Sequence, residues 1–275
     1  MSLKSNFVNL FETRREKLKS LLCIGIDPEF EKLPEICKQA DDPIFHFAET
    51  ILKNTHKFAT AWKPNIAFFE RFGSKGYLAF EKYVSLSREI CPEVPIIADA
   101  KRGDLANTSK EYAKYFFQTL KVDALTVNPY MGRDSLLPYL DLGGFIFVLG
   151  LTSNPSSGDF QKLEIKNESA YLFEVVSDQM ANLESEYPGQ VGLVVGGTHI
   201  SELENLRKRH PHLYFLIPGF GAQGGDLKEI YKACGKNSII NSSRSITLAS
   251  VANNFGEIAN EKAKEVQSQM NQLFS

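Results

Sequence analysis

The sequence predicts a single (β/α)8 barrel of the TIM type, spanning residues 1–275, with one extra N-terminal helix before the first strand. Three observations lead to this fold class. Eight short apolar segments of strand length recur along the chain, helix-like segments separate them, and polar residues gather where the apolar segments end. The length of 275 residues also fits, because such barrels commonly occupy roughly 250 residues as one domain.

The strand candidates are mostly apolar on both faces, as are the buried strands of a parallel sheet. They are Leu21–Asp27, Phe58–Asn65, Pro95–Lys101, Ala124–Asn128, Phe145–Gly150, Val191–Gly197, Tyr214–Gly219 and Ser238–Arg244. An open, doubly wound dinucleotide-binding sheet is the competing fold. It is disfavoured because Gly25-Ile26-Asp27-Pro28 stands where that fold needs a glycine-rich turn.

Helical spacing of apolar residues is clearest from Glu168 to about Glu186. We also expect helices over about Phe7–Ser20, which precedes the first strand, and over Ser109–Phe117, Ile200–Arg209, Asp226–Ala233 and Ile258–Leu273. No domain linker, low-complexity tract or short-period repeat interrupts this alternation. The chain is therefore expected to fold as one domain.

The composition argues against nucleic acid or an anionic membrane as the main partner. Lys and Arg total 31 against 33 Asp and Glu, so the formal net charge is only −2. The charged amino terminus makes a poor signal peptide, and the longest apolar run, Gly143 to Leu151, is far shorter than the ~20 residues that span a bilayer. The four cysteines lack zinc or redox spacing, so we expect reduced, mostly buried thiols in a cytoplasmic protein.

The strongest local motif is Asp99-Ala100-Lys101-Arg102-Gly103-Asp104, directly after the apolar Ile96-Ile97-Ala98. Residues two apart on a strand point to the same face, so Asp99 and Lys101 should project together into the barrel mouth. Asp104 lies in the turn that leads to the next helix, and Arg102 is expected to be a solvated loop residue. A simple salt bridge and ordinary turn chemistry are the alternatives to a functional role.

Lys63, in Trp62-Lys63-Pro64-Asn65, is a second cation inside an apolar strand and should lie near Asp27 on the neighbouring strand. A lysine close to the barrel interior is costly without partners, so we expect Lys63 to pair with carboxylates. Alternating carboxylates and ammonium groups keep one another ionised. They also provide a preorganised field for chemistry in which charge moves.

Other strand ends are polar as well, and in a barrel all of them converge on one mouth, where barrel enzymes hold their active sites. These residues are Asp27, Asn65, Asn128, Ser153, Thr198, Gln223 and Arg244. Ser153 begins the longest irregular stretch, Thr152–Asn167, which is a candidate active-site lid. The histidines, in contrast, form no pattern typical of a metal site, and no Ser or Cys lies in a nucleophile elbow.

A glycine-rich segment, Pro218-Gly219-Phe220-Gly221-Ala222-Gln223-Gly224-Gly225, follows the seventh strand, and Arg244 ends the eighth. Loops after strands seven and eight are a recurrent phosphate site in this architecture. Glycines let backbone N–H groups approach an anion, and an arginine offers a bidentate fork. The glycine-rich segment and Arg244 together therefore predict a phosphorylated ligand.

In their order and placement on successive strands, these motifs resemble those of the orotidine 5′-monophosphate decarboxylases, in the longer-chain bacterial subgroup. The resemblance runs from Gly25-Ile26-Asp27-Pro28 to Ser243-Arg244-Ser245-Ile246 and includes Lys63-Pro64-Asn65. The segment Asp99–Asp104, followed by Asn107 and Thr108, looks like the family signature. Leu105 and Ser243 depart from the pattern, since the family often has Ile and Gly there.

The resemblance implies decarboxylation of orotidine 5′-monophosphate to uridine 5′-monophosphate and carbon dioxide, the last step of de novo pyrimidine nucleotide synthesis. It implies that neither a metal nor an organic cofactor is needed. It also implies a homodimer in which Asp104 crosses the interface into the neighbour's site. It assigns a charged tetrad to Lys63, Asp99, Lys101 and Asp104, with Lys101 as the proton donor. It assigns substrate binding to Asp27 near the ribose, Ser153 at the pyrimidine, Gln223 and Arg244 at the phosphate, and also Asn65, Thr108, Asn128 and Ser243.

Two rival functions remain open. Sugar-phosphate decarboxylases or aldolases of the same superfamily share the Asp-x-Lys-x-x-Asp motif, but those that resemble keto-gulonate phosphate decarboxylase use magnesium and a carboxylate at the second strand. Lys63 argues against that version. A non-catalytic phosphate-binding barrel would bind ligand without turnover, which the intact set of charged residues disfavours.

Overall fold

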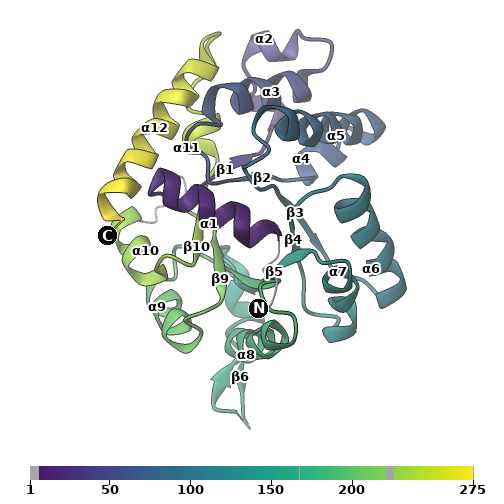
Figure 1. Ribbon diagram of the computed structural model, residues 1–275, viewed down its shortest axis with the longest axis vertical. Coiled ribbons are helices and arrows are strands. Elements are labelled where there is room, and N and C mark those ends of the chain that lie inside the picture. Colours follow the sequence, from purple (N-terminus) through teal and green to yellow (C-terminus); the bar gives the residue numbers. More distant parts are fainter. Residues whose placement is uncertain (1–5, 167, 221–225, 275) are drawn as a thin grey trace.

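The computed structural model describes residues 6–166, 168–220 and 226–274. Eight parallel strands form its main sheet in the order β2-β1-β10-β9-β8-β5-β4-β3. Bridges between Trp62 and Ile96 and between Asn65 and Asp99 join the two edge strands, so the sheet is a nearly closed barrel (Figure 1). The strands are β1 (Leu22–Ile26), β2 (Ala61–Pro64), β3 (Ile97–Arg102), β4 (Ala124–Val127), β5 (Phe145–Leu151), β8 (Val191–Val195), β9 (Tyr214–Ile217) and β10 (Ser238–Ser242).

Helices surround the barrel and connect successive strands (Figure 1). Local chemistry explains where several begin: the Asp42 side chain accepts from the Phe45 amide at the start of α3, and Asp226 accepts from Glu229 at the start of α10. The helices are α1 (Asn6–Leu18), α2 (Glu35–Lys38), α3 (Pro43–Thr55), α4 (Ala67–Glu70), α5 (Gly73–Ile90), α6 (Ala106–Ala113), a π-helix (Lys114–Thr119), α7 (Leu137–Asp141), α8 (Leu172–Glu186), α9 (Ile200–Arg209), α10 (Leu227–Cys234), α11 (Arg244–Thr247) and α12 (Phe255–Leu273).

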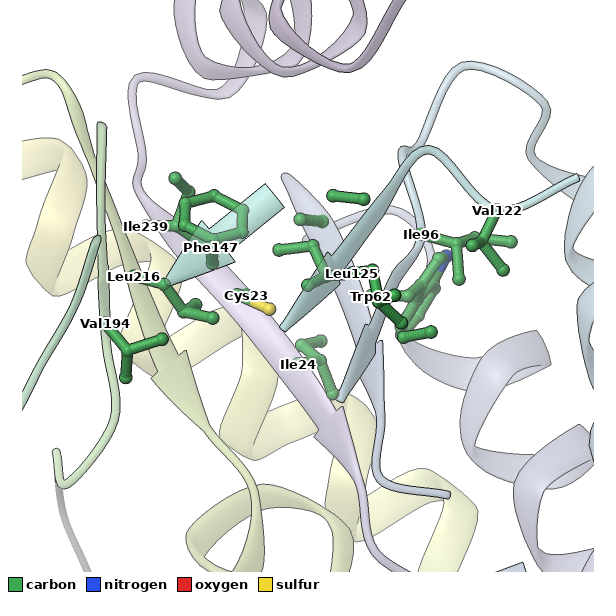
Figure 2. Packing of buried hydrophobic residues seen from close by; sticks show 14 of the residues in the cluster. Cys23, Ile24, Trp62, Ile96, Val122, Leu125, Phe147, Val194, Leu216 and Ile239 are labelled. Carbon is green, nitrogen blue, oxygen red and sulfur yellow. The ribbon is translucent and has the colours of Figure 1, made fainter. Parts of the chain in front are cut away.

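The barrel interior is filled by apolar side chains from opposite strands, as Figure 2 shows for Cys23, Phe147, Leu216 and Ile239. The extra helix α1 packs across the amino-terminal ends of the strands. Its Phe7 ring lies 4.6 Å from the ring of Phe145 and 5.4 Å from that of Phe147. Because α1 closes that end, the carboxyl ends of the strands form the accessible mouth.

The predicted barrel, its eight strands and its extra helix are confirmed, whereas the starts of three predicted helices were wrong. The helix expected from Ile258 begins at Phe255. The helix expected from Glu168 begins at Leu172, because Ala170–Tyr171 (β7) pairs with Glu164–Ile165 (β6) in a small antiparallel hairpin. The helix expected over Ser109–Phe117 begins at Ala106 and changes to a π-helix at Lys114.

The four cysteines are free and buried, as expected: Cys23, Cys37, Cys91 and Cys234. Among the described helices, none is long and apolar enough to cross a membrane.

Candidate active site

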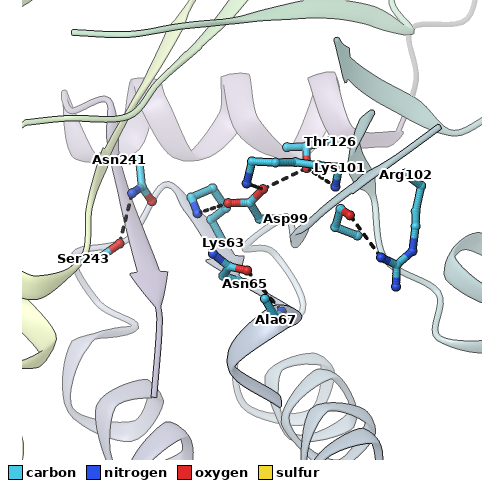
Figure 3. Close-up of polar contacts among 10 residues, drawn as sticks. Lys63, Asn65, Ala67, Asp99, Lys101, Arg102, Thr126, Asn241 and Ser243 are labelled. Carbon is cyan, nitrogen blue, oxygen red and sulfur yellow. Dashed lines mark hydrogen bonds and ion pairs between the residues drawn. The ribbon is translucent and has the colours of Figure 1, made fainter. Parts of the chain in front are cut away.

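A carboxylate held between two ammonium groups lies at the barrel mouth (Figure 3). Asp99 Oδ2 is 2.7 Å from Lys63 Nζ, and Asp99 Oδ1 is 2.6 Å from Lys101 Nζ. The Thr126 hydroxyl donates a further hydrogen bond of 2.9 Å to Asp99 Oδ1. The side chain of Lys63 is 6% exposed and that of Lys101 is 49% exposed, so Lys101 is the cation that faces an incoming ligand.

Lys63 and Lys101 keep Asp99 ionised, and the Asp99 carboxylate in turn favours the charged form of Lys63. Burial alone would raise the pKa of Asp99, but the charges and hydrogen bonds of Lys63 and Lys101 outweigh it and hold that pKa well below its usual range. Burial alone would lower the pKa of Lys63, but the Asp99 and Asp27 carboxylates raise it above its ordinary value. The buried pair of Asp99 and Lys63 therefore carries fixed charges at neutral pH.

The backbone at Lys101 is not regular strand. Its φ is +45°, in the left-handed region that side-chain-bearing residues seldom occupy. The pairing of β3 with β4 shifts register between Ala98 and Arg102, and the Lys101 amide donates instead to Thr126 Oγ1 at 3.0 Å. Lys101 and Asp99 meet as predicted, but by way of a bulge rather than by simple strand alternation.

Asp27 lies at the end of β1, where its Oδ1 atom accepts no hydrogen bond within the described residues. Burial raises the pKa of Asp27, against the opposing effects of the Lys63 charge and of a hydrogen bond from Ser243. A buried acceptor without a partner can accept a hydrogen bond from a ligand hydroxyl. Gly25 makes room for this arrangement, because a Cβ there would lie 1.9 Å from Ser243 Oγ.

Asn241 is a buried polar residue of β10 that the sequence reasoning missed. Its Nδ2 donates to Ser243 Oγ at 3.1 Å, and its Oδ1 accepts no hydrogen bond from the described part of the chain. The sequence carried a signal, since the polar side chain of Asn241 directly follows the apolar pair Ile239-Ile240 within the strand. Asn241 and Ser243 together place polar groups on the β1 side of the mouth (Figure 3).

The side-chain oxygens of two predicted substrate-binding residues take part in local turns. Asn65 Oδ1 accepts from the Ala67 amide at 3.2 Å, at the start of α4. Asn128 Oδ1 accepts from the Tyr130 amide at 2.9 Å. Their roles toward a ligand stay predictions.

Asp104 and Thr108 do not join the Lys63–Asp99–Lys101 cluster within one chain. The Asp104 carboxylate accepts from the neighbouring Leu105 amide at 2.7 Å and forms no ion pair with any described residue. Thr108, on α6, lines a cavity of about 390 Å³ with Tyr77, Arg102, Tyr112 and other residues. One chain thus assembles three of the four members of the predicted tetrad.

Ser153 directly follows Thr152, whose backbone and side-chain polar groups all form hydrogen bonds. Gln161 Oε1 accepts from the Thr152 amide at 2.7 Å, and Gln161 Nε2 donates to Thr152 Oγ1 at 2.8 Å. His199 Nε2 lies 3.0 Å from the Thr152 carbonyl oxygen, so this histidine has a partner that the sequence did not reveal. Gly196 packs against Ser153, since a Cβ at Gly196 would lie 2.9 Å from the Ser153 amide nitrogen.

The predicted phosphate residues are described only in part. Arg244 is exposed and directly follows Ser243, at the start of α11. Gly219 has a φ of +103°, which glycine adopts without strain. Gln223 lies outside the described residues, as do the other members of segment 221–225.

The fold and this site together define a (β/α)8 barrel that carries a carboxylate flanked by two ammonium groups at its mouth. In the described part of the chain, no group of three or more His, Cys, Asp or Glu side chains is arranged to hold a metal ion. Residues 20–254 match the family model described as Orotidine 5'-phosphate decarboxylase / HUMPS family. The chain belongs to this family.

Full-length similarity to individual proteins agrees with the family match. The orotidine 5'-phosphate decarboxylase of Leptospira interrogans is 48% identical over 275 residues, which are 100% of this chain and 99% of the relative. That of Phocaeicola vulgatus is 45% identical over 276 residues, with 98% of each chain covered. The OMP decarboxylase structure from Leishmania donovani superposes with a TM-score of 0.84 at 34% identity, over 98% of both chains.

Proposed function

We propose that the chain is a carboxy-lyase that converts orotidine 5′-monophosphate to uridine 5′-monophosphate and carbon dioxide, the last step of de novo UMP synthesis. Family membership and full-length relatives of that name support the reaction. Asp99 held between Lys63 and Lys101 at the mouth is the observation that carries it. We place the reaction in the cytoplasm, which agrees with four free thiols.

The proposed mechanism follows from where charge must move. Loss of carbon dioxide leaves an electron pair on a pyrimidine ring carbon, which is very unfavourable in water. The Lys101 ammonium stabilises this developing carbanion and then transfers its proton to the carbon. Asp99 lies beside the departing carboxylate and orients Lys101, while buried Lys63 keeps Asp99 ionised.

Substrate binding is assigned to groups around the cluster. The free Asp27 acceptor binds a ribose hydroxyl, Ser153 binds the pyrimidine, and Arg244 with Gln223 binds the phosphate. Asn65, Thr108, Asn128 and Ser243 complete the contacts. Binding energy from the remote phosphate is expressed in the transition state, with the 152–167 loop as the candidate lid. No metal or organic cofactor takes part, because the ammonium groups supply the positive charge.

The proposed assembly is a homodimer in which Asp104 of each chain completes the tetrad of the other. Asp104 forms no ion pair with the described residues of its own chain, which leaves it available to a partner. Apolar side chains near the mouth are also exposed, with Leu105 at 58%, Tyr130 at 87% and Met131 at 44%. Exposed apolar surface of this kind is typical of an interface.

The direct test is the loss of orotate absorbance when chelator-treated protein meets orotidine 5′-monophosphate. We expect rapid loss without added metal, with uridine 5′-monophosphate as the product. No loss with folded protein would contradict the proposal. Turnover of keto-sugar phosphates that requires magnesium would favour the sugar-phosphate branch of the superfamily.

Replacing Arg244 by alanine is expected to raise KM roughly 10- to 100-fold, because a charge-assisted hydrogen bond contributes about 1.5–3 kcal/mol. The value of kcat should change much less, since the phosphate lies far from the bond that breaks. Steady-state kinetics of Arg244→Ala beside Arg244→Lys checks this, with lysine restoring part of the affinity. An unchanged KM in Arg244→Ala would remove this residue from the phosphate site.

A further inference from the structure

Arg102, next to Lys101 in the sequence, is not the solvated loop residue that was expected. It ends β3, its side chain is only 20% exposed, and it points away from the Lys63–Asp99–Lys101 cluster (Figure 3). The Glu70 carboxylate at the end of α4 forms an ion pair with its Nη2. Arg102 therefore lies on the outer side of the barrel wall, directly behind the strand end that carries the active-site charges.

The Arg102 guanidinium spans the irregular backbone at Lys101. Its Nη1 donates to the carbonyl oxygen of Ala100 at 3.2 Å, and the carbonyl oxygen of Arg102 accepts from the Asn128 amide at 2.8 Å. The backbone on both sides of Lys101 is thus tied down. This matters because a φ of +45° at a residue with a side chain costs about 1–3 kcal/mol and persists only where the surroundings enforce it.

The guanidinium is itself held by several separate elements. Glu70 Oε1 also accepts from the Tyr77 hydroxyl at 2.7 Å, which joins the ion pair to α5. The Arg102 guanidinium carbon lies 5.1 Å from the ring centre of Tyr112 on α6 and 5.9 Å from that of Phe116 in the π-helix. Only a planar, forked cation can bond Glu70 and the Ala100 carbonyl together while lying against these rings.

We propose that Arg102 is a positioning residue that holds Lys101 in its left-handed conformation and so keeps the Lys101 ammonium beside Asp99. This inference rests on the proposed role of Lys101 in decarboxylation. Arg102 does not touch the substrate. It acts through the backbone from the opposite side of the barrel wall, with Glu70 as its anchor.

The test compares Arg102→Met with wild type in the full chain. We expect kcat to fall roughly 10- to 100-fold, because a misplacement of about 1 Å at a reacting group can cost this much. The KM and the inhibition constant of uridine 5′-monophosphate should change by no more than about twofold, since the ribose and phosphate contacts remain. Arg102→Lys should not restore kcat, and Glu70→Gln should lower it in the same direction.

Arg71→Met is the matched control, because Arg71 pairs with Glu31 on the surface, with side chains 47% and 61% exposed. We expect it to leave kcat unchanged. Uridine 5′-monophosphate binding stoichiometry gives the fraction of folded sites, so partial unfolding cannot imitate a loss of kcat per site. A folded Arg102→Met enzyme with wild-type kcat would overturn the proposal.

A crystal structure of Arg102→Met provides a readout that does not depend on the reaction. We expect Lys101 to leave the left-handed region and its ammonium to move away from Asp99. A Lys101 φ that remains positive, with the Asp99 contact intact, would refute the positioning role even if the protein acted on another substrate. Absence of orotidine 5′-monophosphate turnover in the wild type would instead refute the proposed function alone.

Discussion

Lys101→Ala is expected to lower kcat roughly 10³- to 10⁵-fold while the protein remains folded. The loss combines a missing proton donor with a missing cation beside the developing carbanion, and each effect alone is commonly worth about 10²- to 10³-fold or more. The fold should tolerate the change, because the Lys101 side chain is half exposed and Asp99 keeps its bond to Lys63. Single-turnover kinetics and a thermal melt would measure the two outcomes separately.

Lys121→Ala is a matched control for this prediction. Lys121 is also a lysine with a positive φ, of +60°, but it precedes β4 at the opposite end of the barrel. The control therefore repeats the loss of one positive charge at a left-handed residue, away from the mouth. Near-wild-type turnover by Lys101→Ala would refute the assignment of the proton donor, whatever the Lys121 variant does.

The barrel could be predicted because its signal is local. Buried parallel strands give continuous apolar runs, and the strand expected over Tyr214–Gly219 is observed as Tyr214–Ile217. The pairing of Asp99 with Lys101 was also local, since the two residues are separated by one position. Details at the ends of elements were missed, as at Glu168, where a small hairpin replaces the first turn of the expected helix.

The features that the sequence did not reveal depend on distant partners. Arg102 looked like a solvated residue because its anchor, Glu70, lies 32 positions away. His199 contacts the Thr152 carbonyl oxygen from 47 positions away, and no local sequence pattern predicts such a contact. The left-handed Lys101 is likewise invisible in a sequence, because no glycine marks it and the tertiary structure imposes it.

The ion pair of Lys63 with Asp99 is expected to be the most sensitive element of stability at the site. The side chain of Lys63 is only 6% exposed, and Asp99 is the only carboxylate bonded to it among the described residues. Asp99→Ala therefore leaves a buried ammonium group without a bonded carboxylate. Breaking a buried pair from one side commonly costs about 3–5 kcal/mol in the free energy of unfolding. Adding Lys63→Met to Asp99→Ala should recover most of that loss, because the Lys63 ammonium is then no longer buried without a bonded carboxylate. Urea unfolding at a fixed protein concentration measures both values.

The same pair predicts a pH dependence with a definite sign. The pKa of Asp99 is lower in the folded than in the unfolded protein, so its contribution is present above the unfolded value of about 3.9 and is lost as the pH falls toward the folded value. Asp27, whose pKa is raised by burial, acts in the opposite direction, so the comparison is best made in an Asp27→Asn background. There, the stability advantage of the intact pair over Asp99→Ala should shrink below about pH 4. An advantage that stays constant into acid would mean that the cluster does not hold Asp99 ionised, and the fixed-charge basis of the proposed mechanism would fail with it.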